Sequence, residues 1–385
     1  ATECRNSSRY IAFAQVSAMV RAMTTDVQEN RVAPAHDGRR LVVGWLALVA
    51  LLVFAMIVLG GVTRLTNSGL SMTDWKPITG WLPPLSHEAW MAEFERYKAF
   101  PEYQKINKGM SLFEFQEIYA FEYAHRVLGR IIGIAFFVPF VLLLLLRKIP
   151  RQMAPRLALL FLLGAAQGGM GWFMVKSGLV DDPDVSHYRL TAHLALASLI
   201  FAALLWTIFD LLRPPYQGHP EAHGAVRRVA WGLLALIALQ ILIGGFVAGL
   251  NAGFIYTDWP MMGGTFLPAD MFDLVPLYHN FLENPSTVQF VHRMVGYAIA
   301  GVSIWLYLIS RGRDLGVGAR AGIAALVSMV FAQVFLGIVT LLYVVPVPLG
   351  AAHQAGGMLV LAFAVFVVHE LGAEQGLRKA GQPSG

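Results

Sequence analysis

The sequence predicts an all-α membrane protein whose eight transmembrane helices form two parallel-repeat four-helix bundles, related by a pseudo-twofold axis along the membrane normal. Three observations predict this fold: the composition, eight long apolar stretches and an internal repeat. Of the 385 residues, 56% are hydrophobic and only 14% are charged, whereas about a quarter of a soluble domain is charged. This composition excludes a disordered chain, a coiled coil and a nucleic-acid-binding protein as general classes.

Each apolar stretch is about 20 residues long, which is the length that crosses a bilayer as a helix. The stretches cover residues 41–63, 125–146, 156–176, 188–212, 228–250, 290–310, 320–345 and 348–371. The long connection 64–124 contains two amphipathic segments, Trp90–Lys98 and Leu112–Phe121. We expect both segments to be short helices that lie over the outer mouth of the first bundle.

The basic residues gather on one side of the predicted topology, and acidic residues occupy the short connections on the other side. The basic positions include Arg39, Arg40, Arg147, Lys148, Arg151, Arg156, Arg213, Arg227, Arg228, Arg311, Arg313, Arg320, Arg378 and Lys379. The positive-inside rule therefore places both termini in the cytoplasm. The net charge of +5 then follows from topology and is no sign of a nucleic-acid partner.

The predicted domain organisation follows from these spans. Residues 1–40 form an N-terminal cytoplasmic tail, 41–212 the first bundle, 228–371 the second bundle and 372–385 a C-terminal tail. The chain begins without Met, and we take Met23 as the true first residue, with a mitochondrial transit remnant as the alternative. The expected location is a bacterial cytoplasmic membrane, and the alternative is the mitochondrial inner membrane.

The two halves of the chain are copies of each other. Residues 60–75 and 244–259 share seven of sixteen residues at a shift of 184, including a final Thr-Asp-Trp. The next span begins His125-Arg in one half and His292-Arg in the other, and both halves later carry Ala-Gln and then a third matched motif ending in His193 or His353. Because each copy has an even number of spans, the copies have the same orientation and form parallel repeats.

Four histidines therefore recur at matching depth: His125, His193, His292 and His353. A histidine within a span is a functional candidate, because an unpartnered polar group is costly there. The alternative is a purely structural histidine in the core, bonded to a backbone carbonyl. This alternative explains a single histidine better than a pair that recurs in both halves. The single cysteine, Cys4, excludes an internal disulfide, a Cys-rich metal site and covalent haem attachment.

Two facing imidazoles in one bundle are typical of the axial ligands of a haem iron. Zinc would require a third or fourth ligand, and copper would be expected to recruit Cys or Met. Arg126 and Arg293 follow the first histidine of each half and are candidates to pair with haem propionates, with snorkelling to the membrane interface as the alternative. The seven other histidines, among them His187 and His369, are interpreted as solvated.

The halves differ at one carboxylate. Glu122 lies three residues before His125, and Gln289 lies three residues before His292. If the helix extends that far, Glu122 shares a face with His125 and offers acid–base or cation-stabilising chemistry beside one site only. The alternative is a surface charge in the first turn of a helix. Arg64 is a second difference, since Ala248 takes its place.

These motifs resemble the haem A synthase family, of the mitochondrial and alphaproteobacterial type. The resemblance covers about residues 41–371 and is carried by GGVTRLTNSGLSMTDWKP from Gly60, PEYQKINKGM from Pro101 and EYAHR from Glu122. The Gram-positive type has a cysteine pair in its outer loops, which this chain does not have. No thiol relay is therefore expected.

The resemblance implies that haem O is oxidised at its C8 methyl group to the formyl group of haem A, by successive hydroxylations that use water. It implies that His125 and His193 hold the substrate haem, that His292 and His353 hold a haem b that passes electrons, and that Glu122 is catalytic. The implied partners are haem O, haem O synthase, cytochrome oxidase assembly factors and the lipid bilayer, with the electron acceptor and a homo-oligomer left open.

Two alternatives compete with this interpretation. A non-catalytic bis-histidine dihaem electron-transfer protein, similar to a cytochrome b, explains the four histidines but not the difference between Glu122 and Gln289. A transporter built on parallel repeats would have charged or unwound helices in mid-membrane, whereas these histidines gather near one face.

Overall fold

The computed structural model describes residues 36–75, 80–179, 185–212 and 224–372. The two predicted tails, except their innermost residues, and the choice between Ala1 and Met23 as the chain start lie outside these ranges. Within them the chain is helical, and eight helices are long and apolar enough to cross a membrane, as predicted. They are α2 (His36–Leu65), α5 (Leu112–Leu145), α6 (Ala154–Gly178), α7 (His187–Leu212), α8 (Gly224–Gly249), α10 (Pro285–Ser310), α11 (Val317–Leu342) and α12 (Val347–Gly372).

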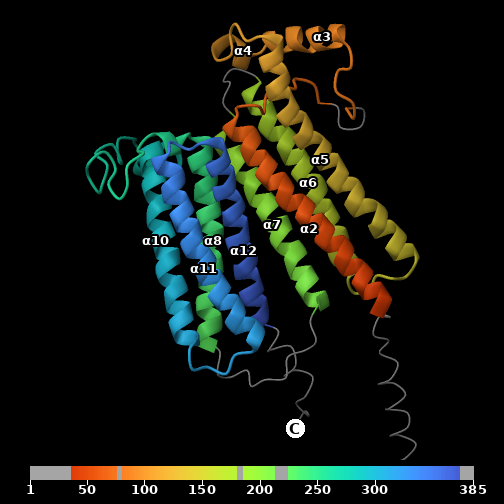
Figure 1. Ribbon diagram of the computed structural model, residues 1–385, viewed down its shortest axis with the longest axis vertical. Helices are drawn as coiled ribbons and strands as arrows, with labels where there is room; N and C mark the ends of the chain where they lie inside the picture. Colours follow the sequence, from red (N-terminus) through yellow and green to blue (C-terminus); the bar gives the residue numbers. More distant parts are fainter. Residues whose placement is uncertain (1–35, 76–79, 180–184, 213–223, 373–385) are drawn as a thin grey trace, which may run out of the picture.

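The long helices form two groups of four, which Figure 1 shows side by side. In the first group α2 contacts α5 and α7, and α6 contacts α5 and α7. In the second group α8 contacts α10 and α12, and α11 contacts α10 and α12. Helices α2, α7, α8 and α12 meet between the groups. These contacts are the ones expected for two four-helix bundles; the pseudo-twofold axis stays a prediction.

The hydrophobic core is continuous across the contact between the bundles. Helices α2, α7 and α12 contribute most of their buried residues to it, whereas α5 and α6 have few fully buried residues. Glycines allow the central helices to approach closely. A Cβ on Gly61 would overlap Gln354 Oε1, and one on Gly245 would lie 2.8 Å from Thr191 Oγ1. Small residues at such contacts are typical of membrane helix packing.

The connection between α2 and α5 contains α3 (His87–Lys98) and α4 (Pro101–Lys105), which Figure 1 shows above the end of the first bundle. Helix α3 confirms the helical prediction for Trp90–Lys98. The second prediction was wrong, because Leu112–Phe121 is no separate helix and forms the first turns of α5. Ser111 and Glu114 form a capping box that starts α5 at Leu112.

We call this end of the bundles the outer end, because the charge pattern predicts that it faces outward. The second bundle has a shorter outer connection, which contains η2 (Ala252–Phe254), η3 (Leu277–His279) and α9 (Asn280–Glu283). In Figure 1 this connection projects sideways from the outer end of the second bundle, beside α10.

Two histidines that we interpreted as solvated are not. His369 is 5% exposed, and its Nε2 lies 2.8 Å from Asp210 Oδ1 on α7. His187 packs its ring against Phe246 of α8, and its Nε2 is buried. Both lie near helix ends, where sequence predicts water, but the contact between the bundles covers them.

Candidate functional site

The four repeated histidines lie on four different helices, two in each bundle. His125 is on α5, His193 on α7, His292 on α10 and His353 on α12. Each side chain is half-buried although it lies within a membrane span. The Nδ1 atoms of His193 and His292 are buried without a hydrogen-bond partner. An orphaned imidazole nitrogen in a span is costly, and a metal ligand bond would satisfy it.

Each histidine ring rests on a glycine of a neighbouring helix. A Cβ added to the glycine would meet the nearest ring atom at 3.4 Å for Gly60 and His125, 3.1 Å for Gly171 and His193, 3.4 Å for Gly244 and His292, and 2.7 Å for Gly337 and His353. Gly60 corresponds to Gly244 in the repeat, and Gly171 to Gly337. An added Cβ would press on the ring at Gly171 and Gly337 and would reach ordinary van der Waals contact with it at Gly60 and Gly244, so these glycines leave room for each imidazole.

The spacing of the second pair fits two axial ligands of one iron. The ring centres of His292 and His353 are 6.4 Å apart, and the rings are twisted by 69°. A metal–imidazole bond of roughly 2.0–2.1 Å, plus about 1.2 Å from nitrogen to ring centre, places two axial ring centres about 6.4–6.6 Å apart. Rotation about the ligand axis leaves this separation unchanged. The residues of the second bundle therefore fit a bis-histidine haem.

Two glutamines hold the second histidine of each bundle, and sequence reasoning gave them no role. Gln167 Nε2 donates to the His193 carbonyl at 3.0 Å and lies 3.3 Å from its ring Nε2. Gln333 Nε2 donates to the His353 carbonyl at 2.7 Å and lies 3.1 Å from its ring Nδ1. The signal was present, because both glutamines recur in the repeat. Such outer contacts orient a ligand imidazole.

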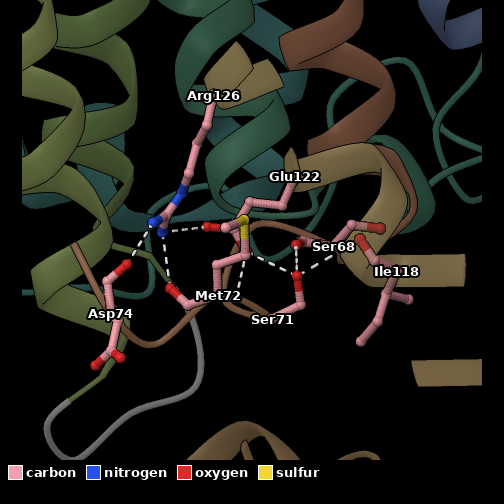
Figure 2. Close-up of polar contacts among 7 residues, drawn as sticks. All are labelled: Ser68, Ser71, Met72, Asp74, Ile118, Glu122 and Arg126. Carbon is pink, nitrogen blue, oxygen red and sulfur yellow. Dashed lines mark hydrogen bonds and ion pairs between the residues drawn. The ribbon is translucent and has the colours of Figure 1, made fainter. Parts of the chain in front are cut away.

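Glu122 lies at the centre of a buried polar cluster, shown in Figure 2. It is 3% exposed and lies in the same helix as His125, one turn away. Its Oε2 accepts hydrogen bonds from Ser71 Oγ and from the Met72 N–H, both at 2.7 Å. Its Oε1 accepts one from Arg126 at 2.5 Å. All three partners are donors, so the cluster suits an ionised carboxylate held in one orientation.

The arginines predicted to meet propionates also fix the outer loops. Arg126 donates to the carbonyls of Met72 at 2.7 Å and Asp74 at 2.8 Å. Arg293 makes the matching contacts in the second bundle, at 3.0 Å to the carbonyls of both Tyr256 and Asp258. Positions 72 and 256 correspond in the repeat, as do 74 and 258. Each guanidinium therefore ties the segment after the first helix of its bundle to the helix of the first histidine.

The two bundles differ where Glu122 lies. Gln289 takes its place in the second bundle and donates to the Tyr256 carbonyl at 2.8 Å. Ser71, which donates to Glu122, corresponds to Ile255 in the repeat. Glu122 and Ser71, the two residues of the first bundle that differ from their counterparts here, therefore contact each other. Sequence comparison showed the first difference; the second was visible in the same alignment, but only the structure shows that Ser71 reaches Glu122.

Outside the spans, the carboxylate of Asp258 in the outer connection of the second bundle accepts two backbone hydrogen bonds. Asp258 Oδ1 accepts from the Gly263 N–H at 3.1 Å and Oδ2 from the Gly264 N–H at 3.3 Å. The hydrogen bond from Gly263 is the largest cause that lowers the pKa of the Asp258 carboxyl. This carboxylate therefore helps to shape the loop that Arg293 holds.

Known proteins resemble this chain over most of its length. Residues 43–365 match a family model, COX15-CtaA, described as cytochrome oxidase assembly protein. The haem A synthase of Parvibaculum lavamentivorans is 49% identical over 342 residues, which are 89% of this chain and 97% of that protein. The chain belongs to the haem A synthase family. The haem A synthase of Rhodospirillum centenum is 48% identical over 353 residues, or 92% of this chain and 93% of its own length.

The match to the haem A synthase family spans both bundles, and all the predicted site residues lie inside it. They are Glu122, His125, Arg126, His193, His292, Arg293 and His353. A further relative, the haem A synthase of Nitrosospira multiformis, is 49% identical over 329 residues, 85% of this chain and 92% of that protein. The resemblance stated from sequence motifs is thereby confirmed.

Proposed function

We propose that this protein converts haem O to haem A, with the reaction in the first bundle and electron transfer in the second. One observation supports this division above the others. The buried carboxylate of Glu122 and its donor Ser71 occur in the first bundle only, while the histidines, their glycines and their glutamines occur in both. A dihaem electron-transfer protein has no need for this difference.

In the first bundle, His125 and His193 would hold the substrate haem and Glu122 would act on its C8 methyl group. Each oxidation removes two electrons and two protons. The first step takes the methyl carbon and one water to a hydroxymethyl group, and the second adds another water to give a hydrated aldehyde. Loss of water from that hydrate leaves the formyl group. The four electrons pass to an external electron acceptor.

Glu122 is suited to two tasks in this scheme. A fixed negative charge stabilises positive charge that develops on the carbon during oxidation. The same carboxylate can accept a proton from the attacking water. Arg126, Ser71 and the Met72 N–H hold the carboxylate in place, so it need not reorganise during the reaction.

In the second bundle, His292 and His353 would hold haem b, with Gln333 orienting His353. Haem b supplies one-electron redox chemistry. Gln289 is neutral and binds a backbone carbonyl, so this bundle holds a cofactor without placing a carboxylate near it. Arg126 and Arg293 remain candidates for propionate contacts in addition to the loop carbonyls that they bind.

The eight spans and the bacterial relatives support a multi-pass membrane protein. We place it in a bacterial cytoplasmic membrane, with both termini in the cytoplasm as the positions of the basic residues predict. The name of the matched family, cytochrome oxidase assembly protein, supports a role in supplying haem to that oxidase. Haem O synthase and oxidase assembly factors are the proposed partners.

The test is the pigment of purified Glu122→Gln protein, produced in cells that make haem O. We expect the bound haem b spectrum to remain and haem A to be absent, because glutamine keeps the shape and removes the charge. Glu114→Gln is the matched control, since Glu114 is an exposed capping carboxylate on the same helix. Normal haem A production by Glu122→Gln would refute the proposed role.

A further inference from the structure

The outer connection of the second bundle has apolar side chains on its surface and polar groups inside. Its exposed residues include Phe272, Leu274, Val275, Leu277, Tyr278 and Phe281, and Val275 is 91% exposed. We call residues 271–284 the apolar loop. A contiguous exposed apolar surface of this kind marks an interaction site.

Two buried asparagines bind part of the backbone of the apolar loop. Asn280 is fully buried; its Oδ1 accepts from the Leu274 N–H, and its Nδ2 donates to the carbonyls of Leu274 and Leu277. Asn284 donates to the Asp270 carbonyl at 2.7 Å. Side-chain amides thus replace water as partners of the loop. A segment that meets lipid has this requirement, because hydrocarbon offers no hydrogen bonds.

The neighbouring acid also turns inward. Asp270 accepts from Tyr256 Oη at 2.8 Å and from Ser286 Oγ at 2.6 Å. The acids of the loop itself, Asp273 and Glu283, are exposed, and Glu283 accepts a hydrogen bond from Tyr188 Oη of α7 at 2.8 Å. The loop therefore combines an exposed apolar surface with two charges, as expected for a segment at a membrane interface, where apolar side chains meet acyl chains and charges meet headgroups. A soluble partner protein could cover such a surface, but the position of the loop favours lipid.

The loop lies beside the bundle and not above it. Figure 1 shows the connection projecting sideways at the outer end of α10, whereas α3 lies above the first bundle. Helix α10 begins at Pro285, directly after the loop, and crosses the membrane. Aromatic and aliphatic side chains at this depth meet the boundary between headgroups and acyl chains.

From these observations we propose that the apolar loop inserts into the outer leaflet and anchors the second bundle in the membrane interface. Its partner is the phospholipid surface itself. The rigid hydrogen bonding by Asn280 and Asn284 presents the apolar side chains without an ordering cost on insertion.

The test places one environment-sensitive fluorophore on the full chain. In a Cys4→Ser background, Val275→Cys is labelled and the protein is reconstituted into vesicles of phosphatidylethanolamine and phosphatidylglycerol. We expect blue-shifted emission, quenching by spin-labelled lipid, and a several-fold weaker quenching by aqueous iodide than for the control. The control is Glu95→Cys, on the exposed face of α3.

A second label at Leu277→Cys guards against a local disturbance by the first substitution. Equal iodide quenching at positions 275, 277 and 95 would overturn the proposal. Iodide protection at 275 and 277 in vesicles without quenching by spin-labelled lipid would also overturn it, since protein would then be the cover.

Discussion

Replacing Arg64 with alanine should loosen the contact between the two bundles at their outer end. Arg64 lies in the last turn of α2 and donates to Asn67 Oδ1 at 3.0 Å and to Asn251 Oδ1 at 2.9 Å. The two asparagines correspond in the repeat, and both follow their helices in the left-handed conformation, with φ of 48° and 53°. One side chain therefore joins matching helix ends of the two bundles.

The expected loss follows from these two bonds. A buried hydrogen bond to a charged group contributes about 1.5–3 kcal/mol. Arg64 is half-buried and both asparagines are exposed, so solvent screening reduces each bond to roughly 0.5–1 kcal/mol. Arg64→Ala should then cost about 1–2 kcal/mol, which corresponds to a fall in melting temperature of roughly 1–3 °C for a chain of this length.

The repeat provides a rescue. Ala248 corresponds to Arg64 and is exposed, so an arginine fits there and can reach the same two asparagines from the other helix. We expect Arg64→Ala/Ala248→Arg to regain at least half of the lost stability. The assay is thermal unfolding of the purified protein, followed by size-exclusion chromatography. Arg151→Ala, at an exposed position, is the control. A double variant as unstable as Arg64→Ala would refute the reasoning.

Three further predictions concern the sites and the outer loop. Ser71→Ala should slow haem A formation by on the order of tenfold, because Glu122 loses a charge-assisted hydrogen bond; the ratio of haem A to haem O in extracted pigment measures this. Gly337→Ala should abolish the haem b absorbance, because its Cβ would lie 2.7 Å from the His353 ring. The pKa of the Asp258 carboxyl is lowered in the folded protein. The ionised carboxylate therefore stabilises its loop at pH values above the ordinary carboxyl pKa near 4, and this stabilisation is lost as the pH falls through the lower pKa of the folded state. Hydrogen exchange of the loop amides should rise as the pH falls through these two pKa values.

Each of these predictions has a control variant or an outcome that separates the proposed effect from general damage to the protein. Gly301→Ala should keep haem b, because nothing lies within 4 Å of the added Cβ. In Asp258→Asn the loop amides should already exchange fast at neutral pH, and their exchange rate should respond less to acid. Unchanged haem A formation in Ser71→Ala, or retained haem b in Gly337→Ala, would contradict the corresponding argument.

The spans and the histidine pairs could be predicted because they depend on periodic, local or repeated features. Apolar length predicts a span, and a polar residue that recurs in two copies stands out from an apolar background. The start of α5 was missed because the amphipathic stretch from Leu112 looks like a separate surface helix. Only the capping box at Ser111 and the continuous hydrogen bonding show that it belongs to the span.

The contacts between elements were harder to predict. His369 was interpreted as solvated, yet it meets Asp210, which lies 159 residues away in sequence. Nothing in the local pattern of α12 indicates that α7 covers this position. Gln167 and Gln333 were visible as repeated residues, but a glutamine in a span has several uses, and only the geometry shows that both hold a histidine.

The two bundles share a common scaffold, and the chemistry that we propose depends on the positions where the two bundles differ. Arg126 and Arg293 bind corresponding carbonyls, and this contact is kept in both bundles. Against this constant frame, the first bundle replaces a neutral amide with Glu122 and supplies Ser71 as its donor. A lone carboxylate at that buried position would be an unpaired charge, which costs several kcal/mol. Ser71 and Arg126 make the charge tolerable because both donate hydrogen bonds to it, so the carboxylate and its serine donor form one functional unit that the second bundle does not have.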